Sequence, residues 1–157
     1  MKIKLILTGK THESYVKEGI LYYVKKLQHY CPFELIETVE LKNTKNLDQE
    51  SVRSKEGENI LAHIKAGDWV VLLDDKGKEY SSLAFSQQIE KKQLQRIKNL
   101  IFVVGGAYGF SKPLYARCDE QLSLSKMTFS HQIIRIIFLE QLYRAYSILH
   151  NEPYHHE

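Results

Sequence analysis

Residues 101–111 of the chain read I-F-V-V-G-G-A-Y-G-F-S, and this stretch decides the fold. Its first four residues form a short, continuous apolar run, which is typical of a parallel strand buried on both faces. The run breaks directly into Gly105, Gly106 and Gly109, which let the backbone turn sharply and approach a ligand closely. Open α/β sheets bind their ligands where buried strands end in such loops. The stretch therefore predicts an α/β fold with a small-molecule site at this loop.

Strand and helix patterns alternate along the rest of the chain. They predict a mostly parallel sheet flanked by helices, and one domain over residues 1–157, because no linker, repeat or low-complexity tract divides the sequence. Gly77 predicts a turn, and Ser81 and Ser82 are N-cap candidates for the helix that follows. The predicted strands are 2–8, 33–41, 69–74, 100–104 and 120–125, and the helices before the last one are 12–30, 47–65, 83–97 and 112–117.

The last helix is the best-defined element of the sequence. Ser130 is a suitable N-cap, Asn151 tolerates a left-handed backbone, and Pro153 cannot continue a helix. Between Ile133 and Leu149, twelve of seventeen residues are Ile, Leu, Phe, Tyr or Ala, and they lie nearly all round the helix. Because one sheet face cannot cover such a helix, we expect a homodimer through it.

Composition excludes several classes of protein. The net charge of +3 is too small for a polycation, and basic pairs such as Lys25-Lys26 and Lys91-Lys92 either attract phosphate or are solvated helix faces. Cys31 and Cys118 lack metal or redox spacing, which is typical of a reducing compartment. Neither a signal peptide nor an apolar run of about 18 residues is present, so we expect a soluble, cytoplasmic protein.

The spacing of the glycine loop fits a dinucleotide badly. The loop reads G-G-x-x-G rather than G-x-G-x-x-G, and no acidic residue follows about twenty positions later to hold a ribose. The phosphate-loop and G-x-S-x-G patterns are also absent. Residues 122–132, L-S-L-S-K-M-T-F-S-H-Q, form a strand and a hydroxyl-rich turn, and residues 72–74 end a further strand. Three strand ends with backbone polar groups and apolar walls suit an adenosine moiety.

Five segments taken together resemble one family. The family is that of the bacterial 23S rRNA pseudouridine-N3 methyltransferases, small enzymes of the SPOUT class that use S-adenosylmethionine. The resemblance covers the whole chain and implies a single SPOUT domain whose C-terminal part forms a deep trefoil knot. It also implies methylation of a pseudouridine in helix 69 of 23S rRNA, on the assembled 70S ribosome. The segments are L-D-D-K-G-K (73–78), V-G-G-A-Y-G-F-S (104–111), L-S-L-S-K-M-T-F-S-H-Q (122–132), E-Q-L-Y-R-A-Y-S-I (140–148) and N-E-P-Y-H-H-E (151–157).

The resemblance also implies which residues contact the cofactor. The expected partners are a second copy of the chain and the ribosome, with neither DNA nor a membrane. Two other functions stay open, a ribosome-associated RNA-binding protein without catalysis and a nucleotide-dependent oxidoreductase. The residues expected to contact S-adenosylmethionine are Leu73, Gly105, Leu124, Ser125, Lys126, Met127, Thr128 and Phe129.

The C-terminal tail carries the candidate catalytic residues. A methyl group on a sulfonium needs chiefly alignment with its acceptor, but the imide proton on N3 of pseudouridine must leave. Tyr154 is a candidate for stacking on the base, and His155 or His156 for accepting the proton, across the dimer. Arg135 is a candidate for gripping RNA phosphate or the base. The alternatives are a frayed, solvated tail and an Arg135 paired with a neighbouring acid. We expect no metal, although His150 and the tail histidines are possible ligands.

Overall fold

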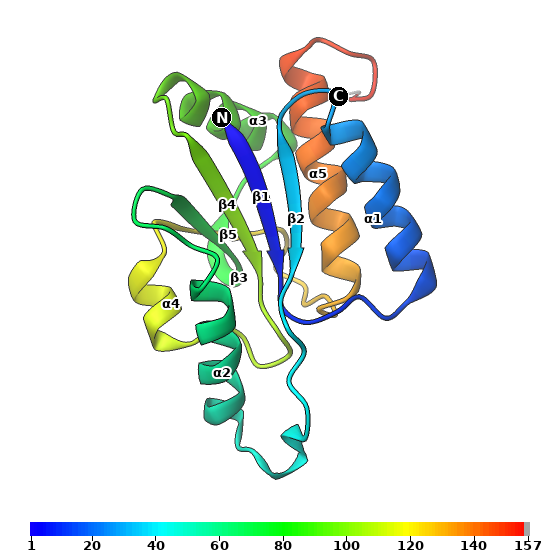
Figure 1. The fold of residues 1–157 in the computed structure, drawn as a ribbon. Helices are drawn as coiled ribbons and strands as arrows, with labels where there is room; N and C mark the ends of the chain where they lie inside the picture. Colours follow the sequence, from blue (N-terminus) through cyan, green and yellow to red (C-terminus); the bar gives the residue numbers. More distant parts are fainter. Residues whose placement is uncertain (156–157) are drawn as a thin grey trace.

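The computed structural model describes residues 1–155 and shows one sheet with helices on both faces (Figure 1). All strand pairs are parallel, in the order β2-β1-β4-β3-β5, which confirms the predicted parallel α/β fold. The strands are β1 (Lys2–Leu7), β2 (Phe33–Glu37), β3 (Trp69–Glu79), β4 (Asn99–Val104) and β5 (Glu120–Ser123). The helices are α1 (Ser14–Leu27), α2 (Gln49–Leu61), α3 (Ser82–Leu94), α4 (Lys112–Arg117) and α5 (Ile133–Leu149), with a 3-10 turn at Thr44–Asn46.

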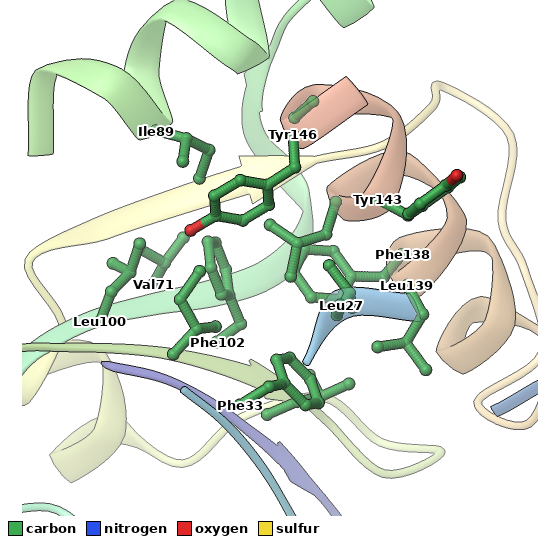
Figure 2. Packing of buried hydrophobic residues seen from close by; sticks show 14 of the residues in the cluster. Leu27, Phe33, Val71, Ile89, Leu100, Phe102, Phe138, Leu139, Tyr143 and Tyr146 are labelled. Carbon is green, nitrogen blue, oxygen red and sulfur yellow. The ribbon is translucent and has the colours of Figure 1, made fainter. Parts of the chain in front are cut away.

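The central strand β4 supplies both cores of the molecule. Alternate residues of a strand point to opposite faces, so Leu100 and Phe102 face α1, α3 and α5, whereas Ile101 and Val103 face α2 and α4. The first core is the larger one, and Figure 2 shows Phe102 packed with residues of α5. The rings of Phe102 and Phe138 lie 4.7 Å apart, centroid to centroid. Full burial of each such side chain contributes about 1.5–3 kcal/mol.

Helix α5 lies between α1 and α3. Its close contact with α1 requires Gly19, because a Cβ there would lie 2.9 Å from Cδ1 of Ile136. All the apolar residues of α5 are buried or half-buried within one chain. The sequence-based argument for a dimer was therefore incomplete, since two neighbouring helices, and not only the sheet, cover this helix. α5 begins near the carboxyl ends of the strands and runs back toward their amino ends (Figure 1).

Several predicted boundaries were wrong. β2 ends at Glu37, and Gly77 lies inside β3 instead of in a turn. The β3–β5 register shifts between Leu73 and Lys78, and the Gly77 backbone crosses Leu122 so closely that a Cβ would lie 2.6 Å from its backbone N. Glycine at position 77 permits the close approach of two strands. In the sequence, such a glycine cannot be distinguished from one that forms a turn.

The helix ends were predicted better. Ser81 Oγ accepts a hydrogen bond from the Ala84 N–H at 3.2 Å and caps α3. α5 begins at Ile133, later than predicted, with Gln132 as its N-cap residue, although Ser130 Oγ accepts from the Ile133 N–H at 3.2 Å. Asn151 has a φ of 54°, the left-handed conformation that ends the helix. No helix in residues 1–155 is long and apolar enough to cross a membrane.

Candidate functional site

A cavity of about 250 Å³ lies where β3, β4 and β5 end. We call it the glycine-loop cavity. Its walls come from the end of β3, from residues 104–110 after β4, and from residues 122–131 after β5. Ile134, in the first turn of α5, also lines it. The three strand ends that the sequence analysis brought together therefore do converge on one site.

The glycine loop is a tight turn over an aromatic ring. The N–H of Gly109 donates to the carbonyl oxygen of Gly106 at 3.2 Å, and Gly109 has a φ of 78°, which favours glycine. A Cβ on Gly105 would lie 3.1 Å from the ring of Phe110, which is buried below the loop. At its three glycines the loop therefore presents backbone to the cavity.

Residues 122–131 form the opposite wall. Ser123 Oγ donates to the carbonyl oxygen of Ser125 at 3.0 Å, and Ser125 Oγ accepts from the Met127 N–H at 2.9 Å. These bonds fix the turn locally and leave Met127 76% exposed, at the mouth of the cavity. The wall combines apolar side chains with hydroxyl groups, a composition that suits a ligand with both a hydrophobic ring and polar edges.

Seven of the eight residues expected to contact a cofactor line this cavity. The exception is Lys126, which does not line it. Phe110 and Ile134 line the cavity as well, and no sequence signal distinguished them from ordinary core residues. The seven residues are Leu73, Gly105, Leu124, Ser125, Met127, Thr128 and Phe129.

Acidic residues at the end of β3 also line the cavity. Asp74 accepts hydrogen bonds from the Lys76 N–H at 2.8 Å and from the phenol of Tyr115 on α4. Burial, together with this carboxylate, raises the pKa of Tyr115 well above its usual range. Tyr115 therefore stays protonated at neutral pH and holds the β3 end against α4.

A second cavity, of about 200 Å³, adjoins the first and was not predicted from the sequence. We call it the neighbouring cavity. It lies at the ends of β1 and β2, and shares Gly106, Ala107 and His131 with the glycine-loop cavity. Glu56 of α2 lines it as well. Burial and the nearby Arg135 lower the pKa of His131, which favours the neutral imidazole at neutral pH.

Arg135 lines neither of these two cavities. Its guanidinium group has no exposed surface and donates to the carbonyl oxygens of Thr8 and His131, at 2.8 and 2.9 Å, and to Thr11 Oγ1 at 2.7 Å. In this structure the side chain therefore cannot touch RNA, which corrects the expectation of a phosphate grip. The structure agrees better with the alternative of an ion pair, because Nη1 of Arg135 lies 3.9 Å from Oε1 of Glu37. Arg135 is a positioning residue that ties α5 to the loop after β1.

The C-terminal tail lies at the far end of α5. The phenol of Tyr154 donates to Oε1 of Glu140 at 3.1 Å, and its ring packs against Tyr143 and under the Arg144 guanidinium. His155 Nδ1 lies 3.4 Å from Nη1 of Arg144. Tyr154 and His155 line neither the glycine-loop cavity nor the neighbouring cavity of their own chain. His156 lies outside the described residues.

Metal ligands do not cluster in the part of the chain that the structure describes. Among residues 1–155, no group of three or more His, Cys, Asp or Glu side chains could hold a metal ion.

Comparison with known proteins finds similar proteins over the whole chain. The family model described as "Predicted SPOUT methyltransferase" matches residues 1–155. The chain is 55% identical over 157 residues to a Parabacteroides distasonis protein named "Ribosomal RNA large subunit methyltransferase H", and all of both chains is covered. Proteins of the same name from Christiangramia forsetii and Phocaeicola vulgatus are 53% identical over 156 residues and 50% identical over 157 residues. The Christiangramia match covers 99% of each chain and the Phocaeicola match covers all of both.

Proposed function

Because the chain belongs to the SPOUT methyltransferase family, we propose that it transfers a methyl group to ribosomal RNA of the large subunit, with S-adenosylmethionine as the donor. The observation that carries this proposal is the glycine-loop cavity, since seven of the eight residues assigned to the cofactor from the sequence line it. The resemblance noted above refines the substrate to N3 of a pseudouridine in helix 69 of 23S rRNA, on the 70S ribosome. Such a substrate agrees with a cytoplasmic location.

The residues of the glycine-loop cavity fit this cofactor. Leu73, Leu124 and Met127 offer apolar surface to an adenine ring, and Ser125 and Thr128 offer hydroxyl groups at the same wall. When bound, S-adenosylmethionine supplies an electrophilic methyl group on a positively charged sulfur. The carboxylates of Asp74 and Asp75 line the same cavity and are suited to ribose hydroxyls or a positive charge.

A single variant tests the cofactor assignment. Met127→Ala removes a mostly exposed side chain from the cavity mouth, so the fold should be unaffected, and we expect cofactor affinity to fall about fivefold for the lost apolar contact. Leu94→Ala is the matched control, because Leu94 is 78% exposed on α3 and lines neither cavity. Titration calorimetry with S-adenosylmethionine measures both. Equal affinities for the two variants contradict the assignment of Met127.

We propose that the active enzyme is a homodimer through α5 and the adjoining face of α1. Support comes from exposed apolar side chains on α1, where Leu21 is 68% and Tyr22 56% exposed. The tail is a further argument, because Tyr154 and His155 line neither cavity of their own chain and so act, in this proposal, on those of a partner. Sedimentation at micromolar concentration should give twice the chain mass, and Tyr22→Glu should lower it. A monomeric mass for the unmodified chain contradicts the dimer.

The tail residues are proposed as substrate-binding and catalytic groups in that dimer. We expect His155→Ala and His156→Ala to reduce turnover and to leave cofactor affinity intact. Unchanged turnover in both variants and in the double variant excludes a catalytic tail. The trefoil knot is likewise retained as a proposal. It is supported by the path of residues 124–132, which cross from edge strand β5 past the ends of β3 and β4 to α5.

The whole proposal is tested with S-adenosylmethionine that carries a radiolabelled methyl group. The protein is incubated with 70S ribosomes, or with free 50S subunits, that lack the modification, and the label is mapped in the RNA. Label at a helix 69 pseudouridine, greater with 70S than with 50S, supports the full proposal. Label elsewhere in large-subunit RNA keeps the enzyme class and rejects the site. Cofactor binding without label would instead favour the RNA-binding alternative.

A further inference from the structure

The neighbouring cavity is positioned to receive an acceptor for the glycine-loop cavity. The two cavities share Gly106, Ala107 and His131, so a molecule in one cavity contacts the same residues as a molecule in the other. We call the backbone of Gly106 and Ala107 the strip between the cavities. A volume of about 200 Å³ equals that of about seven water molecules, the scale of one heterocyclic base. Tyr108, which is 46% exposed and lines the neighbouring cavity, offers a ring for stacking.

Glu56 stands directly behind this strip. A Cβ on Gly106 would lie 2.4 Å from Oε2 and 2.8 Å from Oε1 of Glu56, so the carboxylate occupies the space that any other residue at position 106 would need. Oε2 is buried and has no hydrogen-bond partner within residues 1–155. A buried carboxylate oxygen without a partner is costly for folding, and its retention is typical of a functional site.

Glu56 is not the only ionisable group of the neighbouring cavity. Lys10, His12, Glu40, Tyr108 and His131 line it together with Glu56. Glu40 is paired, because its Oε1 lies 2.7 Å from Nε2 of His12. Burial raises the pKa of the Glu56 carboxyl, and no charged neighbour contributes to that shift. A carboxylate with a raised pKa is the stronger base.

We propose that the neighbouring cavity binds the target pyrimidine and that Glu56 accepts its imide proton during methyl transfer. This inference rests on the proposed function. The N–H bond of the imide breaks as the Glu56 carboxylate takes the proton, and the nitrogen electron pair forms the new bond to the methyl carbon. The carbon–sulfur bond breaks, and its electron pair stays on sulfur and neutralises the positive charge. The proton then leaves Glu56 for solvent, and the carboxylate is restored.

The test compares Glu56→Gln with Glu58→Gln. Glutamine keeps the size of Glu56 but cannot accept the proton, and Glu58 is an exposed residue on the same helix. Single-turnover methylation of 70S ribosomes is measured between pH 6.5 and 9.0, and cofactor affinity is measured by calorimetry. At pH 7 we expect Glu56→Gln to be slower by about a hundredfold or more. We expect Glu58→Gln to match the unmodified chain, and cofactor affinity to stay within twofold in both.

The pH profile separates a base from a merely structural group. Without an enzymic base, the rate of Glu56→Gln should rise about tenfold per pH unit as the imide itself ionises, whereas the unmodified chain should level off once Glu56 is ionised. The free protein supplies a second readout. Carbon-13 NMR of labelled glutamate carboxyls should show one resonance that titrates above the usual range and is lost in Glu56→Gln.

Each outcome decides the proposal. A Glu56→Gln rate within threefold of the unmodified chain overturns it, and so does a slower rate with an unchanged pH profile, which indicates packing alone. Glu56→Asp guards against misfolding, since it keeps the carboxylate and should recover part of the rate. If the unmodified chain transfers no label at any pH, the proposed function fails first and this inference with it. An active unmodified chain with an equally active Glu56→Gln rejects only the role of Glu56.

Discussion

Replacing Arg135 by methionine tests whether this residue positions α5 or acts on substrate. The guanidinium is fully buried and makes three hydrogen bonds, to Thr8, Thr11 and His131. Methionine has a similar length and no donors. It therefore leaves the carbonyl oxygens of Thr8 and His131 without this donor, whereas the Thr11 hydroxyl keeps its hydrogen bond to Oε1 of Glu37.

The expected loss follows from these contacts. Each buried acceptor left without a partner costs about 1–3 kcal/mol, and removal of one member of a buried charged network typically costs about 3–5 kcal/mol. Relief of the buried charge offsets part of this, since burial already lowers the pKa of Arg135. We therefore expect the free energy of unfolding to fall by about 3–5 kcal/mol, and Tm to fall by roughly 6–20 °C for a chain of this size.

Urea denaturation followed by circular dichroism, at one fixed protein concentration, measures this loss. Arg96→Met is the matched control, because Arg96 is an exposed residue and the change should shift the free energy of unfolding by less than about 0.5 kcal/mol. One result refutes the reasoning: an Arg135→Met protein as stable as the control that no longer methylates RNA. Arg135 would then act on substrate, as the sequence analysis first suggested.

Three further predictions concern Gly77, Glu56 and Gly106. Gly77→Ala should lower the free energy of unfolding by about 3 kcal/mol or prevent folding, because its Cβ would lie 2.6 Å from the backbone of Leu122. Gly67→Ala is the control: its Cβ meets nothing within 4 Å, so the same urea titration should show no change in stability. Burial raises the pKa of the Glu56 carboxyl in the folded state, so ionisation of Glu56 opposes folding at high pH. This destabilisation disappears below about pH 4.3, where Glu56 is protonated in the unfolded chain as well. Glu56→Gln should therefore raise the free energy of unfolding at pH 8 by more than at pH 4, and an equal change at both pH values contradicts burial of a charge. Gly106→Ala should displace the flexible Glu56 carboxylate, which should lower the free energy of unfolding by less than about 1 kcal/mol but slow methyl transfer. In a chain that already carries Glu56→Ala, adding Gly106→Ala should not slow methyl transfer further.

The sequence predicted the sheet because buried parallel strands are continuous apolar runs, and residues 100–104 are such a run. It also located the glycine-loop cavity, since the strand ends and the glycines lie in short, recognisable segments. The sequence did not predict the strand order β2-β1-β4-β3-β5, because apolar runs carry no information on which strand lies beside which. Gly77 was misassigned for a similar reason, since close approach of two backbones and a tight turn both require glycine.

Two charged residues mark the limit of pattern reasoning at the site. Glu56 lies on a polar helix beside Lys55 and Glu58, where a carboxylate is normally solvated, and only the fold brings it behind Gly106. Arg135 lies on a largely apolar helix, and the sequence left open whether it grips RNA or pairs with a neighbouring acid. Its partners are instead the loop after β1, more than 120 residues away in the sequence. In both cases the contact that decides the role is too distant in sequence for any local pattern to show it.

The two adjacent glycines at the loop have different physical reasons, and this explains why their spacing matched no nucleotide-binding pattern. Gly105 is required from inside the glycine-loop cavity, where its Cβ would lie 3.1 Å from the ring of Phe110. A Cβ on Gly106 would instead lie 2.4 Å from Oε2 of Glu56, on the other side, and would displace that carboxylate. The strip is thus a shared edge of two cavities rather than a cradle for phosphate. Transfer of a single carbon requires direct contact between donor and acceptor, so in the proposed reaction the two ligands meet at this edge, where neither glycine places a side chain between them.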